Sequence, residues 1–181
     1  MSGPVLRTER LLLRLATFAD LEAVARIYDD PEVIRYLEPA RFADGRSRSW
    51  LGEVLARPHP EGMGVFAVEY EGEVVGRVNL RPSTELPAGL IEVGWYLARP
   101  YWGRGLALEA MTALVGHGFD RLGVPALWAL VPRENASSVR LAERLGFVPV
   151  GSGHYYFREF DVHVLLPDGR EPAPGERSNS R

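Results

Sequence analysis

The sequence lacks two of the reactive side chains on which many enzymes depend. Its 181 residues include no cysteine, and all 21 basic residues are arginine, so lysine is missing as well. Without cysteine the chain has no disulfide, no thiolate nucleophile and no Cys-ligated metal. Without lysine it has no Schiff base and no Walker-type phosphate site. Any group transfer must therefore proceed without a protein thiolate or amine.

Histidine is also sparse, which bears on metal binding. The four histidines lie far apart in the chain and have no spacing typical of metal ligands: His59, His117, His154 and His163. With no cysteine to complete a ligand set, we expect no metal site.

Long hydrophobic runs are absent too. No stretch approaches the roughly 20 apolar residues that cross a bilayer. The opening residues, MSGPVLRTERLLLRL, place an arginine inside a short apolar run and have no small-residue cleavage site. We therefore expect a cytoplasmic protein without a membrane segment. The net charge of −3 with dispersed arginines argues against a nucleic-acid surface.

The length and composition favour one domain. A chain of 181 residues that is 46% hydrophobic can bury one sizeable core but is short for two. We expect this domain to cover residues 1–166. Residues 167–181, PDGREPAPGERSNSR, have too little apolar surface to pack and are expected to form a flexible tail. The sequence leaves the oligomeric state open, a homodimer included.

Hydrophobic periodicity predicts a mixed α/β fold. Glu71-Gly72 separates two Val-rich runs and is typical of a hairpin turn. Hairpins and strand–helix units together indicate a partly antiparallel sheet with helices on it. The predicted strands cover residues 11–15, 65–70, 73–80, 90–97, 126–131, 147–150 and 157–166, and the later helices cover 46–56, 107–122 and 135–145.

Capping residues and apolar spacing place the helices. Thr17, with Asp20 three residues later, is typical of the start of a helix, which we expect to end at Asp30-Pro31. Asn135 is the expected N-cap of the last helix. The helix over residues 107–122 has an apolar stripe through four turns. Three polar residues are expected on its solvent side: His117, Asp120 and Arg121.

The segment WGRGLAL joins the strand at residues 90–97 to the following helix. Gly103 and Gly105 allow a close approach to the backbone, and Arg104 adds a charge between them. The first amides of a helix are unpaired and its N-terminus is partly positive, so this turn predicts an anion site. A dinucleotide fingerprint would need a third glycine at position 108, where the chain has leucine.

Two separated motifs resemble one known family. The strings GWYLARPYWGRGLALEAM and PRENASSVRLAERLGFVPVG are similar to those of the GNAT superfamily of acetyl-CoA-dependent N-acetyltransferases. Within it they resemble the branch of ribosomal-protein alanine N-acetyltransferases. The opening segments LRTERLLLRL and DDPEVIRYL fit that branch, so the resemblance covers about Leu6 to Leu166. It implies a mixed, mostly antiparallel sheet of about six or seven strands, with central strands that splay apart after Leu97.

The resemblance also implies the residues that bind acetyl-CoA. The strand end is expected to pair its backbone with the pantetheine arm, and the loop to hold the pyrophosphate. Trp102 stands where the superfamily commonly has Gln or Arg, so one side-chain contact is lost and the backbone contacts remain. The residues carried over by position are Trp95, Tyr96, Leu97, Gly103, Arg104, Gly105, Leu106, Ala107, Leu108 and Asn135.

Acyl transfer to an amine needs a neutral nucleophile, a stabilised oxyanion and an acceptable leaving group. Many family members place a tyrosine acid where this chain has Ala142, so that role is vacant. The ribosomal-protein branch has a serine, here Ser138, that assists the departing sulfur; bonding to its own helix backbone is the alternative. Glu92, acting through water, is our candidate base, and an arginine ion pair is its alternative role. The rival bases are His154, Tyr155 and Tyr156.

The resemblance implies transfer of an acetyl group to a primary amine, and we favour the α-amine of a protein or peptide. At pH 7 an α-amine costs about 1 kcal/mol to deprotonate, against about 4.6 kcal/mol for a lysine side chain. Acceptor contacts are expected from residues 41–50 and 153–161, with Asp161 near the amine. Arginines there disfavour a polyamine. The alternatives are a non-catalytic acyl-CoA-binding regulatory module and an acetyltransferase for small amines or aminoglycosides.

Overall fold

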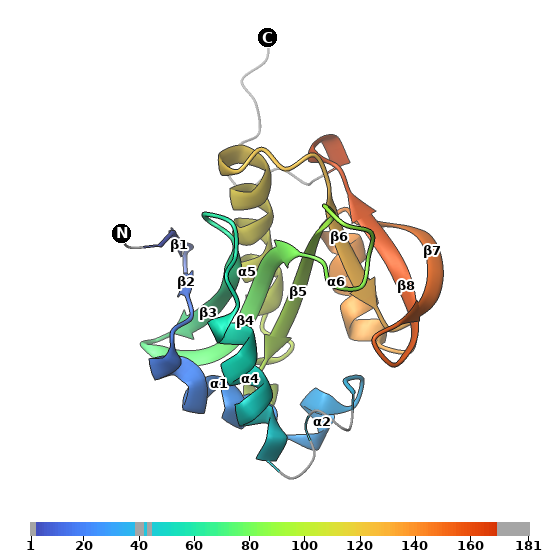
Figure 1. Cartoon of the computed structure of the whole chain (residues 1–181). Helices are drawn as coiled ribbons and strands as arrows, with labels where there is room; N and C mark the ends of the chain where they lie inside the picture. Colours follow the sequence, from blue (N-terminus) through green and yellow to red (C-terminus); the bar gives the residue numbers. More distant parts are fainter. Residues whose placement is uncertain (1–2, 39–41, 43–44, 170–181) are drawn as a thin grey trace.

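The computed structural model describes residues 3–38, 42 and 45–169. Its centre is one eight-stranded sheet in the order β1-β2-β3-β4-β5-β6-β8-β7, antiparallel except where β5 meets β6 (Figure 1). The fold is therefore the mixed, mostly antiparallel one expected, with more strands than the six or seven predicted. The strands are β1 Val5–Arg7, β2 Leu11–Leu15, β3 Gly64–Tyr70, β4 Glu73–Pro82, β5 Ile91–Leu97, β6 Leu127–Val131, β7 Val148–Tyr155 and β8 Arg158–Leu165.

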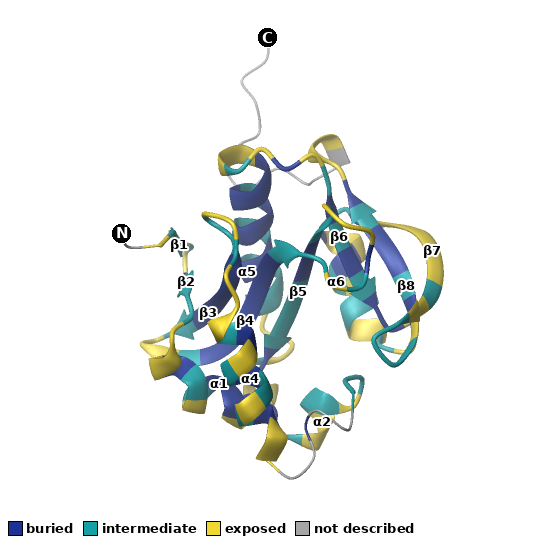
Figure 2. Cartoon of the chain, in the orientation of Figure 1, coloured by how far each residue is buried: buried dark blue, intermediate teal, exposed yellow. Residues whose placement is uncertain are grey.

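Helices cover both faces of the sheet. One face packs on α5, whose Leu106, Met111 and Leu114 are fully buried in the main core (Figure 2). The other face carries α1 and α4, which form a second cluster around Tyr28 and Leu51. The helices are α1 Leu21–Ile27, α2 Pro31–Ile34, α4 Arg46–Ala56, α5 Leu106–Gly116 and α6 Ala136–Arg144. In the described part of the chain, no helix has the length and apolar character that spanning a bilayer requires.

Most of the predicted elements are confirmed, and the caps explain why. Thr17 and Asp20 form the expected capping box on a short 3-10 turn, Phe18–Asp20, that leads into α1. Asn135 caps α6, and its Oδ1 accepts a hydrogen bond from the Ser138 amide. The predicted end of the first helix is wrong, because α1 ends at Ile27. Asp30 instead caps the short helix α2, for which Pro31 is the first residue.

The predicted solvent position of His117 is also wrong. Its side chain is buried, and a ring nitrogen lies 2.8 Å from the Gly62 carbonyl oxygen. His117 directly follows α5 with helical backbone angles, three residues after the buried Leu114 and seven after the buried Ala110, so it continues the buried face of the helix. Asp120 and Arg121 are exposed, as expected. Most of the predicted tail, residues 170–181, lies outside the described residues.

The central strands separate earlier than expected. The parallel strands β5 and β6 pair only at Ile91 with Leu127 and at Glu92 with Trp128. The prediction placed this parting after Leu97. It comes five residues sooner because β5 stays paired with β4 along its whole length, while β6 stays paired with β8. The two halves of the sheet therefore diverge from Val93 onward, and this part of β5 has no neighbour on its β6 side.

A bidentate ion pair stabilises the entry to α1 and gives a testable pH dependence. Arg14 on β2 places its two terminal nitrogens 2.8 and 2.7 Å from the carboxylate oxygens of Asp20. The hydrogen bonds from Arg14 lower the pKa of Asp20 and outweigh the opposing effect of burial. Because the pKa is lower in the folded state, this stabilisation is present above the unfolded value of about 3.9 and disappears as pH falls below it.

We predict that Asp20→Asn lowers the free energy of unfolding by about 2 kcal/mol at pH 7, because it removes one of the two carboxylates, Asp20 and Glu69, that bind the half-buried Arg14. Urea denaturation at pH 7 and pH 3 measures the effect, and the difference from wild type should shrink at pH 3. The matched control is Glu22→Gln, since Glu22 pairs with Arg48 at the exposed surface and should change little. A loss of the same size at both pH values would contradict the prediction.

Candidate active site

A cavity of about 760 Å³ lies where β5 and β6 part. Its wall includes the first turns of α5 and α6, one face of β4, both faces of β5, and the turn between β7 and β8. The residues implied to bind or act on a ligand meet there, because all of them except Arg104 line this cavity: Glu92, Trp95, Tyr96, Leu97, Gly103, Gly105, Leu106, Ala107, Leu108, Asn135 and Ser138.

The turn before α5 presents unpaired backbone amides to this cavity. Gly103 and Gly105 have φ angles of +70° and +77°, which other residues rarely adopt, and Gly105 is the N-cap of the helix. Within the described residues, no hydrogen bond occupies the amides of residues 103–108. An 11-residue helix adds a partial positive charge at the same end. The turn therefore has the free amides that the predicted anion site requires.

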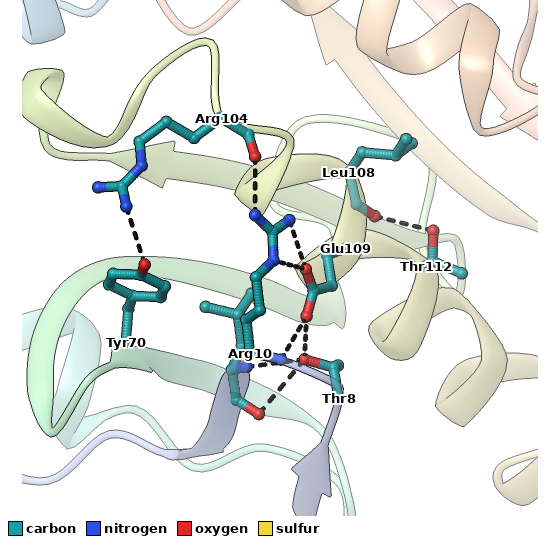
Figure 3. Close-up of polar contacts among 8 residues, drawn as sticks. Thr8, Arg10, Tyr70, Arg104, Leu108, Glu109 and Thr112 are labelled. Carbon is teal, nitrogen blue, oxygen red and sulfur yellow. Dashed lines mark hydrogen bonds and ion pairs between the residues drawn. The ribbon is translucent and has the colours of Figure 1, made fainter. Parts of the chain in front are cut away.

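Arg104 does not line the cavity, although it lies between the two glycines. Its Nη2 donates to the Tyr70 hydroxyl at 2.8 Å (Figure 3). Its guanidinium stacks on the rings of Tyr70 and Tyr101. Its carbonyl oxygen accepts from Arg10, which also binds Glu109. Arg104 is thus held by the protein, and the backbone supplies the donors that face the cavity.

The Arg10–Glu109 pair fixes the start of α5 to the turn between β1 and β2. Glu109 accepts hydrogen bonds from the Thr8 hydroxyl at 2.6 Å and from the Arg10 amide at 2.9 Å (Figure 3). Burial opposes its ionisation, but the hydrogen bonds from Thr8 and Arg10 prevail and lower the pKa of Glu109. The first turn of the helix is thereby anchored to the sheet before any ligand binds.

The open edge of β5 follows from its register with β4. The Ala98 amide donates to the Val75 carbonyl, and the Ser83 amide donates to the Leu90 carbonyl. Every second residue between them therefore directs its backbone N–H and C=O groups toward β4, namely Glu92, Gly94 and Tyr96. The backbone groups of Val93, Trp95 and Leu97 therefore point into the gap. The Leu97 carbonyl already accepts from the Trp102 indole at 2.8 Å. Of the three predicted arm-binding residues, Trp95 and Leu97 thus face the gap through their backbone, and Tyr96 does not.

Ser138 lies at the other wall of the gap, in the first turn of α6. Its hydroxyl oxygen accepts a hydrogen bond from the Trp95 indole at 3.2 Å, across the space between β5 and α6. The described hydrogen bonds of its hydroxyl are therefore with Trp95 and not with its own helix backbone. Its amide is held by the Asn135 side chain at 3.2 Å. Ala142, where a tyrosine acid would stand, is fully buried.

Glu92 lies buried in the same cavity at the centre of a polar network. Its carboxylate accepts from the Ser83 hydroxyl at 2.6 Å and the Tyr156 hydroxyl at 2.9 Å, and Arg81 lies 3.7 Å away. The arginine pairing named as its alternative role is therefore present. Burial, followed by the charge of Glu92, raises the pKa of Tyr156, so its hydroxyl stays protonated near neutral pH. A carboxylate has about four lone-pair positions, which leaves room for a water molecule.

The predicted acceptor residues separate into those inside and outside the cavity. Trp50 and Phe157 line it, as does Tyr156, whose φ angle of +53° is unusual for a tyrosine. His154 is exposed and does not line it. Asp161, the expected partner of the amine, is bound to Arg133 at 2.7 Å. Residues 41, 43 and 44 of the predicted acceptor stretch lie outside the described residues.

Sequence reasoning did not identify the arginines of β4 as cavity residues. Arg77, Asn79 and Arg81 alternate along the strand and lie opposite Tyr96, Gly94 and Glu92 of β5, so they share one face. The available signal was this polar alternation within an otherwise apolar strand. Its meaning depends on which face is covered, and the strand alone does not specify that.

A helix start with free amides, an open strand edge and an adjoining buried polar cavity together fit an extended ligand with an anionic end. The chain matches the Acetyltransferase (GNAT) domain over residues 10–148, and it belongs to this family of N-acetyltransferases. The family uses acetyl-CoA as the acetyl donor. The resemblance seen in the sequence is confirmed at the level of the family.

Relatives and solved structures agree with this assignment. The uncharacterized N-acetyltransferase p20 of Bacillus licheniformis is 30% identical over 149 residues, which are 81% of this chain and 83% of that protein. An acetyltransferase from Agrobacterium tumefaciens is 29% identical with a TM-score of 0.77, covering 91% of this chain and 95% of the other. Mycobacterium smegmatis RimJ in complex with CoA-disulfide shares the fold at 22% identity and a TM-score of 0.69, covering 93% and 88%.

We predict that Gly103→Ala weakens coenzyme A binding about tenfold. Alanine disfavours the positive φ angle by about 1 to 2 kcal/mol, so the loop would turn its amides away from the cavity. Calorimetric titration with coenzyme A measures the affinity. The matched control is Gly123→Ala, because Gly123 has a φ angle of +63° beyond the opposite end of α5, after the π-helical turn His117–Arg121, and has open space around it. Equal affinity in both variants and wild type would contradict the prediction.

Proposed function

We propose that the protein transfers the acetyl group of acetyl-CoA directly to the α-amine at the N-terminus of a peptide or protein. The observation that carries the donor half is the set of unpaired amides at residues 103–108, next to the open edge of β5. A diphosphate fits the amides, and an amide-containing arm fits the edge as an added strand would. When bound, acetyl-CoA supplies an activated acyl group on a thiol leaving group.

The acceptor half rests on the strength of base that the reaction requires. An α-amine has a pKa of about 7.7 to 8.0, so a substantial fraction is already neutral near pH 7. A weak base that accepts a proton through water is enough for such an amine. Glu92 fits this role, because it is a carboxylate in the cavity wall that Ser83 and Tyr156 hold in a fixed orientation.

Ser138 fits the second chemical role, assistance to the departing thiolate. Its hydroxyl proton is free to point into the gap because its oxygen accepts from the Trp95 indole. A hydrogen bond to a developing thiolate costs no rearrangement when the donor is already oriented. Asn135 supports this position, since it holds the Ser138 amide at the start of α6.

Among the comparisons, two names describe acceptors of different kinds. One structural neighbour is named as a ribosomal-protein-serine acetyltransferase from Vibrio cholerae, and a relative of 29% identity over 89 residues is the spermidine N(1)-acetyltransferase of Escherichia coli. The cavity wall favours the first kind of acceptor. Arg35, Arg57 and Arg77 line it, and they would repel a polyamine.

The test is an assay of coenzyme A release with a panel of acceptors. The panel contains peptides that begin with Ala or Ser, N-terminally blocked peptides that contain one lysine, a polyamine and an aminoglycoside. Because the chain has no cysteine, a thiol reagent reports the released coenzyme A without protein background. We expect the free N-termini to react at least about a hundredfold faster at pH 7 than the lysine peptides. No release with any acceptor, or equal rates with blocked peptides, would reject the proposal.

We also predict that Ser138→Ala lowers kcat about tenfold to a hundredfold while the affinity for acetyl-CoA stays within about twofold. The reason is that the hydroxyl acts on the leaving group and not on the diphosphate. Steady-state kinetics and calorimetric titration separate the two quantities. Ser152→Ala on the exposed strand β7 is the control. An unchanged kcat would remove Ser138 from the chemistry.

A further inference from the structure

Arg77 on β4 is a buried cation in the cavity wall. Only 4% of its surface is exposed. Its Cζ lies 4.2 Å from the ring centroid of Tyr96, 5.2 Å from that of Trp50 and 5.5 Å from that of Tyr28. Its Nε donates a hydrogen bond to the Tyr28 hydroxyl. Burial raises the pKa of Tyr28, so this partner is a neutral phenol and not an anion.

The guanidinium of Arg77 has no acidic partner in the described part of the chain, where no carboxylate oxygen lies within 4.0 Å of it. Other buried or half-buried arginines do have one. Arg81, on the same face of β4, lies 3.7 Å from Glu92, and Arg14 lies 2.7 Å from Asp20. Cation–π contacts offset only part of the cost of removing a guanidinium from water. The site therefore carries an uncompensated positive charge.

A second unpaired donor lies beside this charge. The Nδ2 of Asn79 is buried and has no hydrogen-bond partner among the described residues. The Oδ1 of the same side chain accepts from Arg77 Nη1 at 3.4 Å, so the amide and the guanidinium are adjacent. Both residues line the cavity. Buried donors normally have acceptors. Two neighbouring donor groups that lack an anionic acceptor in the described part of the chain therefore indicate that a ligand supplies it.

We propose that Arg77 and Asn79 bind a carboxylate carried by the amine acceptor, an inference that rests on the acetyl transfer proposed above. A guanidinium and a carboxylate match in a bidentate geometry, and the adjacent amide can donate to the same group. The carboxylate has two possible sources. It is either the α-carboxylate of a free amino acid or an acidic side chain close to the N-terminus of a peptide.

The position of Arg77 assigns this anion to the acceptor and not to coenzyme A. The diphosphate has its own donors at the start of α5, which packs on the other face of the sheet. Arg77 lies on the face covered by α1 and α4, and the rings of Phe42 and Trp50 beside it form an apolar wall. An acceptor with one carboxylate and a short apolar body fits this environment, whereas a second amine would be repelled by Arg77.

The experiment compares acceptors that differ by one negative charge. Because the carboxylate also makes the amine of alanine more basic, kinetic constants are compared per neutral amine, from profiles of rate against pH. Alanine is paired with alaninamide, and the amidated peptide Ala-Glu-Phe is paired with Ala-Gln-Phe. For each pair, kcat and KM are measured with acetyl-CoA, and the binding of each compound to the protein loaded with coenzyme A is measured by calorimetry. A preference in the first pair identifies an α-carboxylate, and a preference in the second identifies an acidic side chain.

Three variants connect any preference to Arg77. Arg77→Met keeps the apolar stem inside the aromatic rings without the charge, and such a replacement commonly preserves stability. Arg77→Lys keeps the charge but not the bidentate geometry. Arg48→Met is the control, because Arg48 lies on the exposed side of α4 with Glu22 and Asp29. Thermal unfolding of all variants shows whether the fold is kept.

The expected result is that the carboxylate-bearing member of at least one pair has a KM or Kd lower by about 10- to 100-fold. Arg77→Met should remove this preference, Arg77→Lys should restore part of it, and Arg48→Met should keep it in full. The inference is overturned if acceptors react without a charge preference, or if Arg77→Met slows both members of each pair equally. If no compound releases coenzyme A, the proposed function fails and calorimetry alone tests the inference. A carboxylate preference in binding that Arg77→Met leaves unchanged then overturns the inference.

Discussion

The separation of β5 from β6 is the constraint on which the rest of the site depends. After Glu92 and Trp128 the two strands no longer pair, so the backbone groups of Val93, Trp95 and Leu97 face a gap. Unpaired backbone groups inside a protein are costly. Here each half-sheet keeps its full pairing on the side away from the gap, β5 with β4 and β6 with β8. The gap is therefore a stable feature of the fold, and it fits a ligand that brings its own amides.

The gap also joins the two faces of the sheet, which differ in chemistry. On the α5 face the Trp95 indole binds Ser138, and the amides before α5 are unpaired. On the opposite face Glu92 and Arg77 lie in polar and aromatic surroundings. Consecutive residues of one strand alternate between these faces. A single strand can thus contribute to both the proposed donor site and the proposed acceptor site.

The sequence was informative where structure is decided locally. Alternation of apolar residues, the Glu71-Gly72 turn and the Thr17 cap each depend on a few neighbouring residues, and the structure confirms them. It was uninformative where structure depends on distant partners. The buried ring of His117 has its polar partner at Gly62, 55 residues away, which no local pattern shows. The place where β5 and β6 part depends on which neighbour each strand keeps, and no local pattern records that choice.

The candidate site shows the same division. The turn before α5 was recognisable because glycine is the residue that favours positive φ angles, so the residue type itself indicates the backbone conformation. The uncompensated charge of Arg77 was not, because a counter-ion is recognised only when every neighbour in space is known. Arg81 and Arg77 are four residues apart on one face of β4, yet among the residues that the structure describes only Arg81 has a carboxylate within 4.0 Å. The difference between a structural ion pair and the anion site proposed here therefore lies in the packing around each arginine and not in the strand that carries both.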